Sequence, residues 1–300
     1  MDVAPFARGG RFWRGNLHTH STRSDGRLPP EAVIEFYRTA GYDFLALTDH
    51  FMECYAYPIT DTRALRSSGF TTLLGAEIHA PITTKGADWH IVAVGLPLDY
   101  APWTSGETIQ SMCARAAGAG AFIGVAHPQW YGLTFDDAAS IAQAHAIEIY
   151  NHGCALECDR GDGLVLLEEV LAQGRRLHGY AADDAHFKTP DAGGGWVMVK
   201  AEALEPTLLL EALKRGDYYS SQGPQIHDIT IAGDTLTVAC SPASWIVIAG
   251  TGMGSECAHG QDLTRATLPL SGVEDGYVRV TVTDDKGRRA WSNPIWGVKG

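Results

Sequence analysis

The stretch NLHTHSTRSDG at residues 16–26 places His18 and His20 two positions apart, with Asp25 five positions further on. Residues two apart on a β-strand point to the same face, so both imidazoles would converge while Thr19 turned away. Two imidazoles with a carboxylate close by are a common start for a divalent metal site. A pair of surface or hydrogen-bonded histidines would have the same spacing, so the rest of the chain must decide.

The same residue types recur where later apolar runs end. In chain order these positions carry Asp49 and His50, Glu77 and His79, His90, His127, and then Asp183, Asp184 and His186. In an α/β barrel the C-terminal strand ends share one face, and that face holds the active site. Packing gives no reason for histidine or carboxylate at each of these ends. Their succession therefore predicts one shared metal site.

Strand and helix patterns alternate from residue 16 to about residue 224. Strands are predicted at 15–20, 44–48, 72–79, 89–95, 121–127, 147–150 and 177–182. Helices are predicted at 31–41, after a capping box of Thr104 and Glu107, and at 136–145, 163–173 and 206–215. Such alternation predicts a parallel sheet wrapped by helices. We expect an α/β fold with a barrel at residues 1–224; an open doubly wound sheet is the alternative.

The pattern changes after Pro224. Short strands are predicted at 226–232, 235–240, 244–249, 266–270, 277–284 and 289–295, with turn residues between them and no helix. We expect a small antiparallel β appendage at 225–300 that packs on the barrel and supplies no metal ligand. The glycine-rich residues 250–256 lack the Lys-Ser/Thr ending of a phosphate loop, so a hairpin connection is expected there.

Composition narrows the classes of function. The net charge of −12 argues against nucleic acid as the main partner, because neutralising phosphates requires a basic face. No apolar run has the length of a signal peptide or a membrane span, which predicts a soluble, cytoplasmic protein without a membrane partner. The six cysteines form no CxxC pair, as expected of reduced thiols.

Five motifs together resemble a known superfamily. NLHTHSTRSDG, LTDH, GAEIH, VAHP and DDAH are similar, in order and spacing, to motifs of the PHP (polymerase and histidinol phosphatase) superfamily, across residues 16–190. SSQGP at 220–224 and AWSNPI at 290–295 resemble the subgroup named after carbaryl-hydrolysing metalloesterases. The resemblance implies a distorted (β/α)7 barrel and a metal-dependent hydrolase.

The resemblance also implies a donor set for two to three divalent ions. The first ion would take His18, His20, Glu77 and Asp184; the second Glu77, His90 and His127; the third Asp25, His50 and His186. Nitrogen and oxygen donors without thiolate suit Mn, Zn or Fe, whereas so many imidazoles disfavour Mg or Ca. The family often has a Cys or His near residues 147–151. Here Asn151 and His152 stand in that region, and both are left out of the donor set.

Several residues are given supporting roles. Asp49 is expected to orient a ligand rather than bind metal, and His79 either faces the site or packs as a hydrogen-bonded histidine. Arg23, Lys85 and Lys188 lie in loops beside predicted ligands. They are candidates to bind a substrate anion, with an ordinary solvated side chain as the alternative for each.

The first functional hypothesis is a phosphoesterase in which a metal-bridging hydroxide attacks phosphorus in a small-molecule phosphoester. Its catalytic residues would be Glu77, Asp184, His50 and His186; either of these histidines, or Asp25, could help protonate the leaving group if the third ion is absent. The second hypothesis is a carboxylic or carbamate ester hydrolase with the same site. Aromatic residues near the ligands favour it: Trp89, Trp130, Tyr131 and Phe187. The third is a non-catalytic metal-binding regulatory module.

Overall fold

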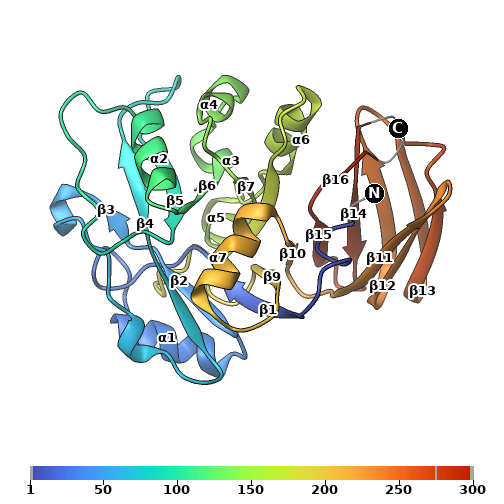
Figure 1. The fold of residues 1–300 in the computed structure, drawn as a ribbon, viewed down its shortest axis with the longest axis horizontal. Helices are drawn as coiled ribbons and strands as arrows, with labels where there is room; N and C mark the ends of the chain where they lie inside the picture. The colour runs from blue at the N-terminus through green and yellow to red at the C-terminus, as the bar shows by residue number, and fades with distance from the viewer. Residues whose placement is uncertain (1–2, 274–275, 298–300) are drawn as a thin grey trace.

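One sheet runs through the computed structural model, which describes residues 3–273 and 276–297 (Figure 1). The strands nearest the site follow one another in this order: β1 (Arg11–Asn16), β2 (Phe44–Leu47), β4 (Thr71–Ala80), β5 (Trp89–Val94), β6 (Phe122–Val125), β7 (Ala146–Asn151) and β8 (His178–Ala182). The two-residue strand β3 (His50–Phe51) pairs with the second half of β4. The predicted α/β class is therefore confirmed.

The sheet is mixed rather than parallel, because β5 runs antiparallel to both β4 and β6. Parallel neighbours need a long crossover, usually a helix, whereas only residues 81–88 join β4 to β5. The chain therefore turns back on itself at this point. As a result, the start of β5 lies beside the C-terminal end of β4.

The predicted closed barrel is not confirmed, because the sheet stays open. Within the described residues β8 pairs only with β7, while the other side of β1 is taken by β9 (Trp196–Ala201), followed by β10 (Tyr218–Ser221). The hydroxyl of Ser220 links β10 to β8: it accepts from the Ala181 N–H at 3.0 Å and donates to the Gly179 carbonyl at 3.1 Å. Side-chain bonds thus connect the two strands where a backbone ladder would close a barrel.

The helices are short and amphipathic: α1 (Pro30–Thr39), α2 (Ile109–Gly118), α3 (Pro128–Tyr131), α4 (Phe135–Ser140), α5 (His152–Cys158), α6 (Leu164–Ala172) and α7 (Pro206–Arg215). None in the described part of the chain combines the length and apolarity needed to cross a bilayer. The helix expected from Thr104 begins one turn later, because Thr108 and Ser111 form the capping box. Helix α4 ends before the predicted residue 145, since Ile141 leaves the helical conformation.

The C-terminal strands are antiparallel to one another, as predicted, and are coloured orange to red in Figure 1. They are β11 (Ile226–Ala232), β12 (Thr235–Gly250), β13 (Ser255–Pro269), β14 (Tyr277–Thr283), β15 (Arg289–Ser292) and β16 (Ile295–Trp296). Two predicted strands merge into β12, whose pairing with β13 shifts register between Ala239 and Trp245. The Gly250 N–H donates to the Gly254 carbonyl at 2.9 Å, which confirms a hairpin connection.

The C-terminal strands join the rest of the sheet through the pairing of β15 with β10. Asn293 strengthens this junction from a buried position: its side chain accepts from the Gly179 N–H and donates to the carbonyls of Gly216 and Tyr218. The division of the chain at residue 224 remains a prediction.

Candidate metal centre

Glu77 is the hub of the site. The second half of β4 buries its carboxylate completely. Oε1 lies 2.8 Å from Nδ1 of His90 and 3.1 Å from Nε2 of His127, while Oε2 lies 2.6 Å from Nδ1 of His50. Three segments, β3, the start of β5 and the residues after β6, thus deliver imidazoles to one carboxylate.

His18 and His20 lie just beyond β1, which ends at Asn16, so the predicted strand over 15–20 is placed four residues too late in the chain. Both side chains are nevertheless buried and converge, with ring centroids 5.2 Å apart. Oδ1 of Asp184 lies 2.9 Å from Nε2 of His20 and 3.2 Å from Nε2 of His18. The Asp184 N–H donates to the His18 carbonyl, so the backbone holds these segments together.

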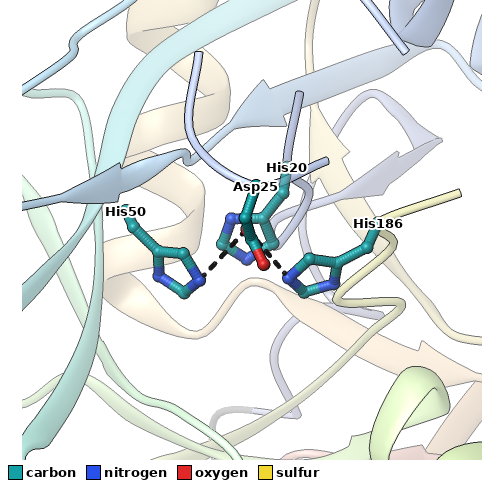
Figure 2. A group of neighbouring side chains, drawn as sticks. All are labelled: His20, Asp25, His50 and His186. Carbon is teal, nitrogen blue, oxygen red and sulfur yellow. Dashed lines mark ion pairs between the residues drawn. The ribbon is translucent and has the colours of Figure 1, made fainter. Parts of the chain in front are cut away.

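Asp25, together with His50 and His186, forms the part of the cluster nearest to solvent, called here the Asp25 arm. Figure 2 shows its carboxylate between the rings of His50 and His186, with His20 alongside. Oδ1 of Asp25 lies 3.4 Å from Nε2 of His50 and 3.3 Å from Nε2 of His186. The side chains of Asp25, His50 and His186 are 29%, 15% and 19% exposed, whereas Glu77 is fully buried. This arm is therefore the most accessible part of the cluster.

Among the residues that the structure describes, four overlapping groups have ligand atoms within 4.8 Å of one another: His20, Asp25, His50 and His186; His50, Glu77, His79 and His90; His18, His127 and Asp184; and His18, His20 and Glu77. Several buried atoms in these groups make no hydrogen bond, namely Nε2 of His18, Oε2 of Glu77, Oδ1 of Asp25 and Nδ1 of His127. Buried polar atoms normally have partners, and cations would provide them here. The donor set therefore fits divalent metal ions.

The protein groups of the cluster shift one another's pKa values. Burial would raise the pKa of Glu77, but the charges of His50, His90 and other histidines hold it well below its usual value. Burial dominates at His20, together with repulsion by His50 and His186, and lowers its pKa to about 3. A buried site in which neighbouring groups titrate so far apart is typical of functional centres.

All nine predicted donors lie in this cluster: His18, His20, Asp25, His50, Glu77, His90, His127, Asp184 and His186. His79 joins them, with its Nε2 2.9 Å from Nδ1 of His50, so of its two expected positions it takes the one facing the site. The assignment of these side chains to particular ions remains a prediction.

Asp49 and Asp183 support the loops that carry the donors. Asp49 accepts hydrogen bonds from the backbone and hydroxyl of Ser21 and from the hydroxyl of Ser24, which fixes the turn between His20 and Asp25. Asp183 accepts from Tyr37 and from three consecutive glycine N–H groups at residues 193–195. Asp49 therefore acts on the loop and contacts no predicted ligand ring in these bonds.

Sequence reasoning missed Glu148 and underused Asn151, which are both completely buried. Glu148 lies 3.1 Å from Nδ1 of His18, and Asn151 donates to both Glu148 and Asp184. The signal available in the sequence was a single charged residue inside the apolar strand AIEIYN. Charged side chains are almost never fully buried unless they are paired.

A cavity of about 310 Å³ opens onto the cluster. Besides six of the donors, its lining consists of Trp130, Gly153, Cys154, Glu157 and Lys188. Nζ of Lys188 lies 2.9 Å from Oδ2 of Asp25. Arg23 lines a different hollow, beside Tyr55, and Lys85 lines a third beside Gly132. A role for any of these three cations in substrate binding remains a prediction.

Comparisons with known proteins identify the fold. No protein-family model and no curated protein matches the sequence. A two-domain protein from Bacteroides vulgatus, containing a predicted PHP-like metal-dependent phosphoesterase, is 15% identical with a TM-score of 0.53, and the match covers 98% of this chain and 99% of that one. The chain therefore shares its fold with this protein over 98% of its length, whereas the (β/α)7 barrel that the PHP resemblance implies is not confirmed.

Two further solved structures match part of the chain. A proposed metal-dependent phosphoesterase from Bifidobacterium adolescentis is 17% identical over 59% of this chain and 89% of that one, with a TM-score of 0.43. An amidohydrolase from Chromobacterium violaceum, with bound sulfate and no metal, is 17% identical over 57% and 87%, with a TM-score of 0.43. The resemblance to the carbaryl-hydrolase subgroup remains a prediction.

Proposed function

We propose that the chain is a metal-dependent hydrolase that cleaves small-molecule phosphoesters. One observation carries the proposal: overlapping histidine–carboxylate groups, two of which share Glu77, lie beside a cavity that six of the donors and Lys188 line. A purely structural cluster has no need of such a cavity, whereas a pocket with convergent polar groups of shifted pKa is typical of an active site.

The charge of the cluster favours an anionic substrate. Its donor groups contain three carboxylates, Asp25, Glu77 and Asp184, and the remaining donors are imidazoles. Glu148, which contacts His18, adds a fourth carboxylate, so two divalent ions would balance the carboxylate charge and three would exceed it by two. A cavity floor of net positive charge attracts a phosphoryl group more strongly than a neutral ester.

Manganese, zinc or iron held by these donors would supply Lewis acidity, which lowers the pKa of water and polarises a phosphoryl oxygen. The chain's own groups have further tasks. Lys188, paired with Asp25, places a positive charge on the cavity wall for an outer phosphoryl oxygen. His186 lines the same wall with Nε2 beside Asp25, so when no third ion is bound this pair is placed to transfer a proton to a departing alkoxide.

Hydrolysis of a carboxylic or carbamate ester is the second candidate. Trp130 favours it, because its ring is 42% exposed although it lines the cavity. An exposed aromatic wall suits the apolar alcohol of an aryl ester. The same wall would also contact an aryl phosphate, so Trp130 alone does not select between the two bonds.

A comparison of matched substrates tests the proposal. The purified chain, loaded with Mn²⁺ or Zn²⁺, is assayed with aryl phosphomonoesters, aryl phosphodiesters and aryl carboxylic esters that release the same phenol. We expect phosphoesters to give the higher kcat/KM. Faster turnover of the carboxylic ester would replace the phosphoesterase assignment with the second candidate.

A further inference from the structure

Glu148 contacts two residues of the metal cluster, His18 and His127, and also contacts Asn151. Oε1 lies 3.1 Å from Nδ1 of His18, and Oε2 accepts from the backbone N–H of His127 at 2.6 Å and from Nδ2 of Asn151 at 2.9 Å. The carboxylate is completely buried and contributes to none of the four donor groups. All the groups it contacts therefore belong to predicted ligands or to Asn151.

The contact with His18 fixes which ring nitrogen carries the proton. A carboxylate only accepts, so Nδ1 of His18 must donate to Glu148. The other nitrogen, Nε2, is buried, faces Glu77 and Asp184 at 3.6 Å and 3.2 Å, and makes no hydrogen bond. Its lone pair is thus directed into the cluster, where a cation would bind.

Asn151 orients the carboxylate of Asp184 through hydrogen bonds. Its Oδ1 accepts from the Cys154 N–H at 2.8 Å, so its NH₂ group must face the carboxylates. That group donates to Oε2 of Glu148 at 2.9 Å and to Oδ2 of Asp184 at 3.1 Å. The side-chain amide therefore links the two carboxylates and keeps Oδ1 of Asp184 turned toward His18 and His20.

We propose that Glu148, supported by Asn151, is a positioning residue: it holds His18 in the Nδ1–H tautomer, so that the Nε2 lone pair faces a metal ion, and it anchors the backbone that carries the His127 ring beside Glu77. Outer carboxylates that accept from a ligating histidine raise its basicity and fix its orientation. This inference rests on the metal-binding part of the proposed function and is independent of the bond that is cleaved.

Replacing Glu148 by Gln should change which ring nitrogen of His18 carries the proton. The two donors at the Oε2 position require the amide oxygen there, which leaves the NH₂ group facing Nδ1 of His18. Nδ1 would then have to accept, and the ring proton would move to Nε2, where it blocks metal binding. Loss of such an outer partner typically weakens metal binding by about 10- to 100-fold.

The test uses zinc and the full chain. Zinc affinity is measured by competition with a chelating dye, and the ring N–H protons are detected by NMR after ¹⁵N-histidine labelling. Asp137→Asn is the matched control, because Asp137 is a buried carboxylate that accepts from Thr84 and Thr134 and contacts no imidazole in these bonds.

We expect the zinc-loaded wild type to show an Nδ1–H resonance for His18. Glu148→Gln should lose this resonance and bind zinc about 10- to 100-fold more weakly, while Asp137→Asn retains both properties. Wild-type affinity in Glu148→Gln, or an equal loss in Asp137→Asn, would overturn the inference. So would the absence of the His18 Nδ1–H resonance in the zinc-loaded wild type, a result that does not depend on any variant folding. A wild-type chain that binds no zinc would instead overturn the proposed function, and this inference with it.

Discussion

Oε1 of Glu77 on β4 lies 2.8 Å from Nδ1 of His90 on β5, across an antiparallel strand pair. His79 is the direct partner of His90, so Glu77 is its diagonal neighbour on the same face of the sheet. If β5 ran parallel to β4, residue 90 would lie at the opposite end of the strands, away from Glu77. The short connection between the two strands is thus what brings a histidine from the start of β5 to the hub carboxylate.

Glu77→Gln should abolish most turnover and leave the protein folded. The carboxylate faces imidazoles from three segments, and the neutral amide cannot hold cations between them. We expect kcat/KM to fall at least about 100-fold, equivalent to about 2.7 kcal/mol, with an unchanged far-UV circular dichroism spectrum. Asp184→Asn should behave in the same way, and Asp137→Asn serves as the control. Wild-type hydrolysis in either cluster variant would show that the hub is misassigned.

The chain should bind about three divalent ions at saturation, and the ion at Asp25, His50 and His186 should leave first. These side chains are partly exposed, so water competes there more effectively than at the buried groups. Elemental analysis after increasing dialysis measures the order of loss, and Asp25→Asn should remove only the weakest ion. Occupancy that never exceeds one ion per chain would refute this prediction.

Metal binding at the Asp25 arm should release protons. Burial alone would lower the pKa of His186, but the neighbouring carboxylate of Asp25, together with the charge of Asp184, raises it to about 9. An imidazolium cannot bind metal, so affinity should increase as the pH rises from about 7 to about 9. The stability of the metal-free protein should change with pH in the opposite direction. The protonated His186 ring stabilises the fold fully below its unfolded pKa of about 6.5, and this stabilisation is lost as the pH rises through about 9.

Calorimetry in buffers of different ionisation enthalpy detects this proton release at pH 7. His186→Gln should reduce it, whereas His227→Gln, which alters an exposed histidine outside the cluster, should not. Equal proton release in all three proteins would contradict the assignment of the proton to His186.

Lys188→Ala should lower kcat/KM for phosphoesters by about 1–3 kcal/mol of lost charge-assisted binding. Lys188 lines the cavity beside Asp25, whereas Arg23 lines a separate hollow, so Arg23→Ala should cost less. Activity of both variants is compared on an aryl phosphate and on the matching aryl carboxylic ester. Full activity in both variants, together with faster ester turnover, would favour the second candidate function.

The sequence predicted the metal donors better than the strand directions and pairings that bring these donors together. His18, His50 and His186 could be identified because histidine at the end of an apolar run has no packing explanation. The reversal of β5 was missed because an apolar strand such as WHIVAV has the same pattern in either direction. Strand β9 was missed as well, although it pairs with both β1 and β10 and helps to keep the sheet open. Strand pairing depends on contacts between distant segments, which periodicity does not record.

Glu148 shows a different limit of sequence reasoning. Its charge stood out within AIEIYN, but its role depends on His18, which lies 130 positions away in the chain. Asn151 was left out of the donor set because it stands where the family often has a Cys or His, yet it links two carboxylates of the site. Residues that act through other residues can be recognised only when the fold brings their partners together.

Reconstitution of the metal-depleted chain tests the central claim most directly. Mn²⁺ or Zn²⁺ is added stepwise to the depleted protein, and phosphate release from an aryl phosphate is recorded together with the bound metal. The account predicts no release before metal is added and a rate that rises with occupancy until the Glu77 cluster is filled. Hydrolysis that is independent of bound metal, or a saturated chain that cleaves no phosphoester, would contradict it.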